Sequence, residues 1–157
     1  MNIIFNFLIF FRIHNVLLGV LLILIGGFLG LGKVLITEPL AIAMLSILFS
    51  CMGCVALNNY WDREVDKIVH PLRVKALNSL TPQFAYLSGF ILFICAFITG
   101  IFVSISFELF LILGFILFLF YEHKTKNRGL SGNMTVAVTL PLILISGGVA
   151  VHNPHPS

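Results

Sequence analysis

The chain has 157 residues, of which 59% are hydrophobic and 10% are charged, and its formal net charge is +3. Because soluble domains average about 25% charged residues, this composition excludes an ordinary water-exposed surface. The long apolar runs lack the period-2 alternation of barrel strands, so they predict transmembrane helices. The basic residues lie between these runs, where membrane topology explains them, and they do not indicate nucleic-acid binding.

About 20 apolar residues cross a bilayer as a helix. The sequence therefore predicts an all-α, polytopic transmembrane bundle with about five spans. An apolar stretch from Ile3 to Phe11 precedes the first span, and we expect it to lie along the membrane interface. Thr81 and Pro82 are typical of an N-cap and a first helical residue. The predicted spans cover residues 15–32, 39–60, 83–103, 107–121 and 133–151.

The basic residues also predict the orientation of the bundle, because cytoplasmic loops are enriched in Lys and Arg. With the N-terminus inside, Lys33 is the one basic residue of nine that falls outside. The sequence therefore predicts a multi-pass protein of the cell membrane with a cytoplasmic N-terminus. The cytoplasmic set lies before residue 15 and in loops 61–82 and 121–132, and comprises Arg12, Arg63, Lys67, Arg73, Lys75, Lys124, Lys126 and Arg128.

Glycines recur through the predicted spans, and Gly26 and Gly30 have the GxxxG spacing. Small residues at such positions let neighbouring helices approach closely in a membrane. This pattern supports a packed bundle and indicates no particular activity.

An acidic stripe begins where the second span leaves the membrane. Asn58, Asp62 and Asp66 are four residues apart, which places them on one face of a helix, roughly 6 Å apart along its axis. Mg²⁺ prefers oxygen ligands and often completes its shell with water and substrate phosphates. The stripe therefore predicts half of a diphosphate–Mg²⁺ site, with these three residues as metal ligands and the aspartate motif on the cytoplasmic side.

The alternative is a solvated helix end whose charges serve topology and solubility. In that interpretation Asp62 and Asp66 pair locally with Arg63 or Lys67. Asn58 favours a site, because an amide at the edge of the bilayer core needs a partner.

Basic residues of the two cytoplasmic loops are candidate ligands for a diphosphate. Arg73 would bind phosphate through a fork of hydrogen bonds, and Lys126 would act as a point charge. Membrane topology alone would also place both residues there, so both interpretations stay open for them. For Lys124 and Arg128 the topological interpretation is favoured.

These residues resemble the UbiA-type family of intramembrane prenyltransferases. Residues 58–66, NNYWDREVD, are similar to the first aspartate motif of the family, N-D-x-x-D-x-x-x-D, with Asn59 in place of the usual Asp. Residues 67–82 resemble the loop that follows this motif and keep its Lys67 and Arg73.

Two further segments carry the resemblance. Residues 121–137 are similar to the Y-x-x-x-L-K-x-x-x-L-x-G-N pattern that follows the fourth helix of the family, and residues 12–15, RIHN, are similar to the entry of its first helix. The residues that match the former pattern are Tyr121, Lys126, Leu130, Gly132 and Asn133.

The resemblance implies transfer of an isoprenoid chain from an allylic prenyl diphosphate to an acceptor within the membrane, with Mg²⁺ as the cofactor. Catalytic roles would fall on Asp62, Asp66, Arg73 and Lys126. Mg²⁺ held by Asp62 and Asp66 would neutralise the diphosphate leaving group, and Arg73 and Lys126 would stabilise its growing charge. The implied substrate-binding residues are Asn58, Arg12, Asn15, Tyr121 and Asn133.

The family fold has nine helices and a second aspartate motif, and this chain resembles its first five helices. We therefore expect residues 1–157 to form a single transmembrane domain that is truncated relative to the family and incomplete alone. It would pair with a second polypeptide, or it would be a relic or a non-catalytic bundle that binds prenyl lipid.

The acceptor is less clearly indicated. The loop pattern favours archaeal lipid synthesis, in which geranylgeranyl is added to geranylgeranylglyceryl phosphate, and an aromatic acceptor of a quinone pathway is the alternative. CDP-alcohol phosphotransferases also use spaced intramembrane aspartates. They are disfavoured because no D-G-x-x-A-R precedes Asp62.

Overall fold

The computed structural model describes residues 3–126 and 128–152, and within them it contains helices and no strand. Five of the helical segments are long and apolar enough to cross a membrane. The elements in chain order are α1 (Ile3–Phe10), α2 (Ile13–Leu31), α3 (Glu38–Trp61), α4 (Arg63–Val69), α5 (Pro71–Leu80), α6 (Pro82–Ile101), α7 (Ile105–Phe120), the π-helical turn η1 (Tyr121–Thr125) and α8 (Leu130–His152).

The prediction of an all-α bundle with five spans is confirmed. Each long segment begins and ends within three residues of its predicted range, apart from α7, which continues through η1 to Thr125. The start of α6 is also as predicted, because Pro82 opens the helix and the Thr81 hydroxyl accepts a hydrogen bond from Phe84 N at 3.3 Å.

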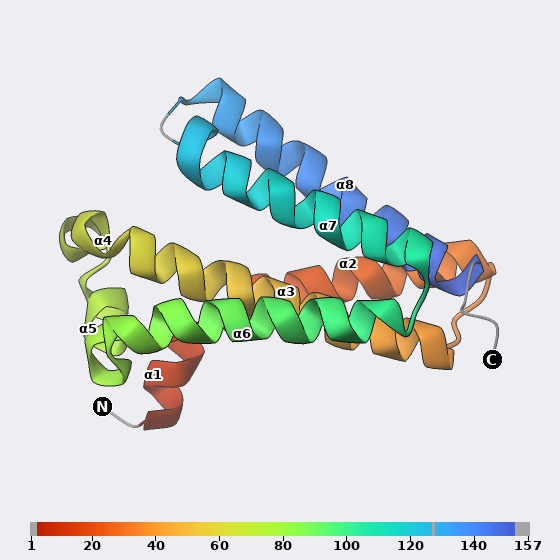
Figure 1. The fold of residues 1–157 in the computed structure, drawn as a ribbon, viewed down its shortest axis with the longest axis horizontal. Coiled ribbons are helices and arrows are strands. Elements are labelled where there is room, and N and C mark those ends of the chain that lie inside the picture. Colours follow the sequence, from red (N-terminus) through yellow and green to blue (C-terminus); the bar gives the residue numbers. More distant parts are fainter. Residues whose placement is uncertain (1–2, 127, 153–157) are drawn as a thin grey trace.

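The predicted loop 61–82 instead contains the short helices α4 and α5. Neither helix is long enough to span a membrane, so the pattern of long apolar runs does not predict them. Pro71 at the first position of α5 separates the two, because proline is tolerated at a helix start and disfavours helix in the residue before it. Figure 1 shows α1, α4 and α5 together at one end of the bundle, toward which the C-terminal end of α7 and the start of α8 also point.

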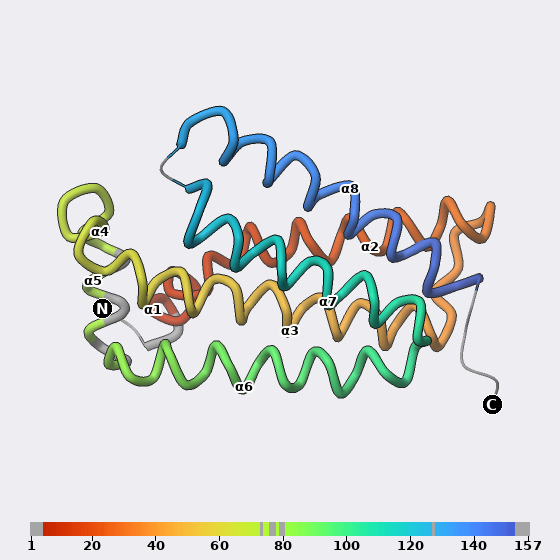
Figure 2. The backbone as a smooth tube through the Cα atoms, turned by 45° about the horizontal axis from the view of Figure 1, so that its top comes forward, coloured from red at the N-terminus to blue at the C-terminus, as the bar shows by residue number. Residues whose placement is uncertain are grey.

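Glycines set the closest helix crossings. A Cβ at Gly26 of α2 would overlap the Leu144 carbonyl oxygen of α8, and one at Gly30 would lie 2.9 Å from the Cα of Gly148. The predicted role of the GxxxG positions in close packing is therefore confirmed. Toward the α4 end, the α7–α8 pair diverges from α3 and α6 (Figures 1 and 2).

Candidate diphosphate and metal site

The acidic stripe lies at the junction of α3 and α4. Asp62 ends α3 with φ −85° and ψ 1°, so the segment is two helices and not the single helix that the spacing predicts. The amides of Asp62 and Asp66 still donate to the carbonyls of Asn58 and Asp62, both at 2.8 Å. This continuous i→i−4 pattern keeps Asn58, Asp62 and Asp66 on successive turns.

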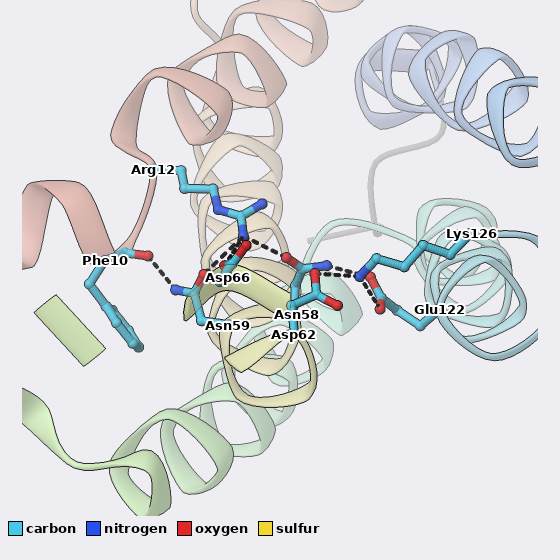
Figure 3. Close-up of polar contacts among 8 residues, drawn as sticks. All are labelled: Phe10, Arg12, Asn58, Asn59, Asp62, Asp66, Glu122 and Lys126. Atoms are coloured by element: carbon cyan, nitrogen blue, oxygen red, sulfur yellow. Dashed lines mark hydrogen bonds and ion pairs between the residues drawn. The ribbon is translucent and has the colours of Figure 1, made fainter. Parts of the chain in front are cut away.

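Arg12 approaches the stripe from the connection between α1 and α2. Its backbone is left-handed, with φ 44°, and it follows the buried rings of Phe10 and Phe11, which anchor the connection. The Arg12 Nη2 donates to Asn58 Oδ1 at 2.7 Å and lies 3.8 Å from Asp66 Oδ2 (Figure 3). One guanidinium therefore joins the first and third residues of the stripe.

Asn59, the residue that departs from the resemblance, is buried and binds two groups. Its Nδ2 donates to the Phe10 carbonyl at 2.6 Å, and its Oδ1 accepts from Arg12 Nη2 at 3.0 Å. An ionised Asp has no donor, so it could accept from Arg12 but would face the Phe10 carbonyl with a second acceptor. The amide therefore suits this position, where one neighbour is an acceptor and the other a donor.

Lys126 approaches the stripe from the opposite side, just beyond η1. Its Nζ donates to Asp62 Oδ2 at 2.5 Å and to Glu122 Oε2 at 2.7 Å (Figure 3). Glu122 also accepts from Asn58 Nδ2 at 2.6 Å through its other oxygen, and its side chain is 3% exposed. Sequence reasoning assigned Glu122 no role. The one local signal was its position four residues before Lys126, where opposite charges can pair on a helix.

The turn η1 places Glu122 and Lys126. Its wide π geometry is closed by a hydrogen bond from Lys126 N to Tyr121 O at 2.8 Å, and such turns occur frequently at functional sites. The start of α8 holds η1, because the hydroxyls of Thr125 and Thr135 lie 3.2 Å apart in the buried interior. A Cβ at Gly132 would lie 2.8 Å from the Thr125 carbonyl oxygen, so glycine permits this contact.

The local cations contact a different carboxylate. Lys67 Nζ lies 2.7 Å from Glu64 Oε2, and Arg63 Nε lies 3.6 Å from Glu64 Oε1. Hydrogen bonding to Lys67, together with its charge, lowers the pKa of Glu64. In contrast to the alternative interpretation, the cations that the structure shows on Asp62 and Asp66 come from other elements.

The remaining predicted residues are less closely connected. Tyr121 is half-buried, and its ring centroid lies 6.0 Å from Lys126 Nζ. Asn15 and Asn133 are exposed, and neither joins the cluster in the part of the chain that the structure describes. Arg73 belongs to α5, but its side chain lies outside the described residues.

An apolar cavity of about 190 Å³ lies between α3, α7 and α8. It extends from Tyr121, next to Glu122, to Phe107 near the opposite end of α7. Gly114 lines it, and a Cβ added there would meet no atom within 4 Å. The polar cluster therefore lies at the head of an elongated apolar space.

Comparison with known proteins decides the family. A sequence model described as the UbiA prenyltransferase family matches residues 19–157. The chain belongs to the UbiA prenyltransferase family. Together with the five apolar spans, this membership makes it an integral membrane protein.

Curated UbiA relatives include archaeal enzymes named digeranylgeranylglyceryl phosphate synthase. The one from Thermococcus gammatolerans is 27% identical over 140 residues, which cover 89% of this chain and 51% of the relative. The one from Methanococcus aeolicus is 34% identical over 112 residues, which cover 71% of this chain and 40% of the relative. The chain spans about half the length of the curated relatives it matches.

A solved structure shows the same UbiA-type fold. It is described as "Structural and mechanistic insights into the biosynthesis of Digeranylgeranylglyceryl phosphate synthase in membranes". The TM-score is 0.88 at 20% sequence identity, and the match covers 98% of this chain and 55% of that chain.

Proposed function

We propose that this chain forms the first aspartate wall of an intramembrane prenyltransferase that transfers a geranylgeranyl group from its diphosphate to geranylgeranylglyceryl phosphate. The observation that carries the proposal is the cluster at the head of the apolar cavity, where Arg12 and Lys126 flank Asp66 and Asp62. The names of the archaeal relatives support this acceptor over an aromatic one.

The donor atoms of the stripe fit Mg²⁺. Asn58, Asp62 and Asp66 offer oxygens from one amide and two carboxylates, which is the type of ligand that Mg²⁺ prefers. We infer that these three residues hold the metal together with the substrate diphosphate. When bound, Mg²⁺ would neutralise the charge that develops on the departing diphosphate.

The two cations that flank the stripe would bind phosphate oxygens directly. Arg12 can use the planar donor fork that suits phosphate, and Lys126 supplies a mobile point charge. Both side chains are partly buried, at 16% and 20% exposed, so their charges act in a region of reduced water screening. Preorganised cations of this kind stabilise charge as it develops on a leaving group.

The cavity would hold the isoprenoid chain. Its lining is predominantly aliphatic and aromatic, and it includes the rings of Phe118 and Tyr121 where α7 passes into η1. An apolar wall excludes water from the reacting carbon, and aromatic ring faces attract an allylic cation. The diphosphate would then lie at the cluster while the hydrocarbon tail follows α7 into the membrane.

The first test concerns the proposed diphosphate and metal site. It measures binding of geranylgeranyl diphosphate to the purified chain in detergent, with and without Mg²⁺. We expect Mg²⁺-dependent binding that weakens by at least about tenfold in Asp62→Ala and in Asp66→Ala, because each variant removes an oxygen ligand. Glu64→Gln is the matched control, since Glu64 is an exposed carboxylate of α4 outside the cluster. Binding that is unchanged in both Asp variants would refute the proposed site.

The variant Gly114→Phe tests whether the apolar cavity holds the isoprenoid chain. The added ring would enter the open space beside Gly114 and compete with the isoprenoid chain. We expect weaker binding of geranylgeranyl diphosphate and unchanged binding of inorganic diphosphate. Leu113→Phe is the control, because Leu113 is 43% exposed on the outer surface of the bundle. Equal loss of both ligands would argue against the cavity as the chain site.

A further inference from the structure

Lys126 contacts two carboxylates, and binding of the substrate would affect these two contacts differently. Its Nζ lies 2.5 Å from Asp62 Oδ2 and 2.7 Å from Glu122 Oε2. Under the proposed function, Asp62 binds the metal and gives up this contact. Glu122 lies outside the aspartate stripe, so its contact with Lys126 can persist.

Glu122 also holds the first residue of the stripe. Its Oε1 accepts from Asn58 Nδ2 at 2.6 Å, and the Oδ1 of the same amide accepts from Arg12 at 2.7 Å. The Asn58 amide is therefore oriented from both sides, with its oxygen toward a cation and its nitrogen toward Glu122. The Glu122 carboxylate on η1 therefore contacts both the Asn58 amide of α3 and the Lys126 ammonium just beyond η1.

We propose that Glu122 is a positioning residue that keeps the Lys126 ammonium and the Asn58 amide in place while Asp62 is engaged by metal and diphosphate. This inference rests on the proposed function for the identity of the ligand. Its physical basis is the rigidity of the support: the Glu122 side chain is nearly fully buried, and η1 is held to α8 at Thr125. A carboxylate that moved with the substrate could not serve as a fixed anchor.

Removal of the Glu122 charge should change the affinity for diphosphate in opposite directions, depending on whether Glu122 positions its neighbours or acts mainly through its negative charge. A buried carboxylate repels a nearby diphosphate, so its loss would strengthen binding if its field were the main effect. If Glu122 positions Lys126 and Asn58, its loss weakens binding even though one negative charge has gone. The sign of the change therefore separates the two roles.

The first measurement is the affinity of Glu122→Gln for geranylgeranyl diphosphate with Mg²⁺ in detergent. We expect a loss of about tenfold, because truncation of supporting hydrogen bonds around a metal site typically costs 10–100-fold in affinity. Glu64→Gln is again the control and should bind as the wild type does. Binding by Glu122→Gln that is equal to or tighter than wild-type binding would overturn the proposal.

The second measurement needs no diphosphate. Acylation of lysines by N-hydroxysuccinimidyl acetate, quantified by mass spectrometry, compares Lys126 with the exposed Lys124 two residues away. We expect Lys126 to react several-fold more slowly than Lys124 in the wild type and in Asp62→Asn, where Glu122 still holds it. In Asp62→Asn combined with Glu122→Gln, which removes both carboxylates that contact Lys126, the two lysines should react at similar rates.

The labelling result distinguishes failure of this inference from failure of the proposed function. If the wild type binds no diphosphate, the proposed function fails, and the ratio of lysine reactivities still decides whether Glu122 anchors Lys126. If Lys126 reacts as fast as Lys124 in Asp62→Asn, Glu122 is not the anchor. The labelling of Asp62→Asn therefore tests the inference even if Glu122→Gln does not fold.

Discussion

Asn59 illustrates, at the scale of single residues, how a polar group buried near the site depends on donor and acceptor matching. Its amide donates to the Phe10 carbonyl and accepts from Arg12, and the residue is 4% exposed. A buried acceptor that faces another acceptor loses a hydrogen bond and gains repulsion, which typically costs about 1–3 kcal/mol. The amide thus stabilises the connection that carries Arg12 to the stripe.

The variant Asn59→Asp should therefore lower the stability of the protein by about 1–3 kcal/mol, with part of the loss offset by attraction to Arg12. Thermal unfolding in detergent measures the change. Asn78→Asp in α5 makes the same chemical change at an exposed position and should have little effect. If the two variants melt at the same temperature, the inferred hydrogen bonds of Asn59 contribute little.

At the scale of elements, the α2–α8 crossing depends on glycines. The backbones approach so closely that a Cβ at Gly26 would overlap a backbone carbonyl, which cannot rotate away as a side chain can. In lipid such close packing replaces the hydrophobic effect as the main attraction between helices. The position of α8 in turn decides where η1 presents Glu122 and Lys126.

Gly26→Ala should destabilise the bundle by about 1–3 kcal/mol, as overpacking of a close contact generally does. The same change at Gly114, where a Cβ meets open space, should be nearly neutral. Unfolding of the two variants in detergent checks this difference. A Gly26→Ala protein as stable as Gly114→Ala would show that the crossing tolerates expansion.

At the scale of the whole molecule, the α3–α4 junction that carries the stripe lies at the end of the bundle with α1, α4 and α5 (Figure 1). Lys33 follows the C-terminal end of α2, and Arg12 precedes its N-terminal end. Basic residues are retained on the cytoplasmic side during insertion. We therefore propose that the cluster faces the cytoplasm of the cell. The second polypeptide that the sequence suggests as a partner stays a prediction.

Cysteine accessibility tests this orientation. In a background with Cys51, Cys54 and Cys95 replaced by Ala, Lys33→Cys should react with a membrane-impermeant maleimide in intact cells. Lys124→Cys should react only after the membrane is permeabilised. The reverse pattern would place the aspartate stripe outside and contradict the proposed topology.

The sequence by itself determined the five spans and the acidic stripe. Whether a segment spans the membrane depends on the total hydrophobicity of its own residues, so a run of apolar residues predicts a span whatever helices pack against it. The four-residue spacing of Asn58, Asp62 and Asp66 likewise depends on local helical geometry, which persists through the break at Asp62. Pro82 and the Thr81 hydroxyl act within one turn, so the start of α6 was also predictable.

Only the tertiary structure decided which groups surround the stripe. Arg12 and Glu122 contact Asn58 across 46 and 64 residues of sequence, and Lys126 contacts Asp62 across 64. Such contacts depend on how helices cross and on the π-helical turn that aims Glu122 and Lys126 at α3, and neither has a reliable local signature. The proposed role of Glu122 depends on tertiary structure, because its carboxylate lies between the Asn58 amide of α3 and the Lys126 ammonium.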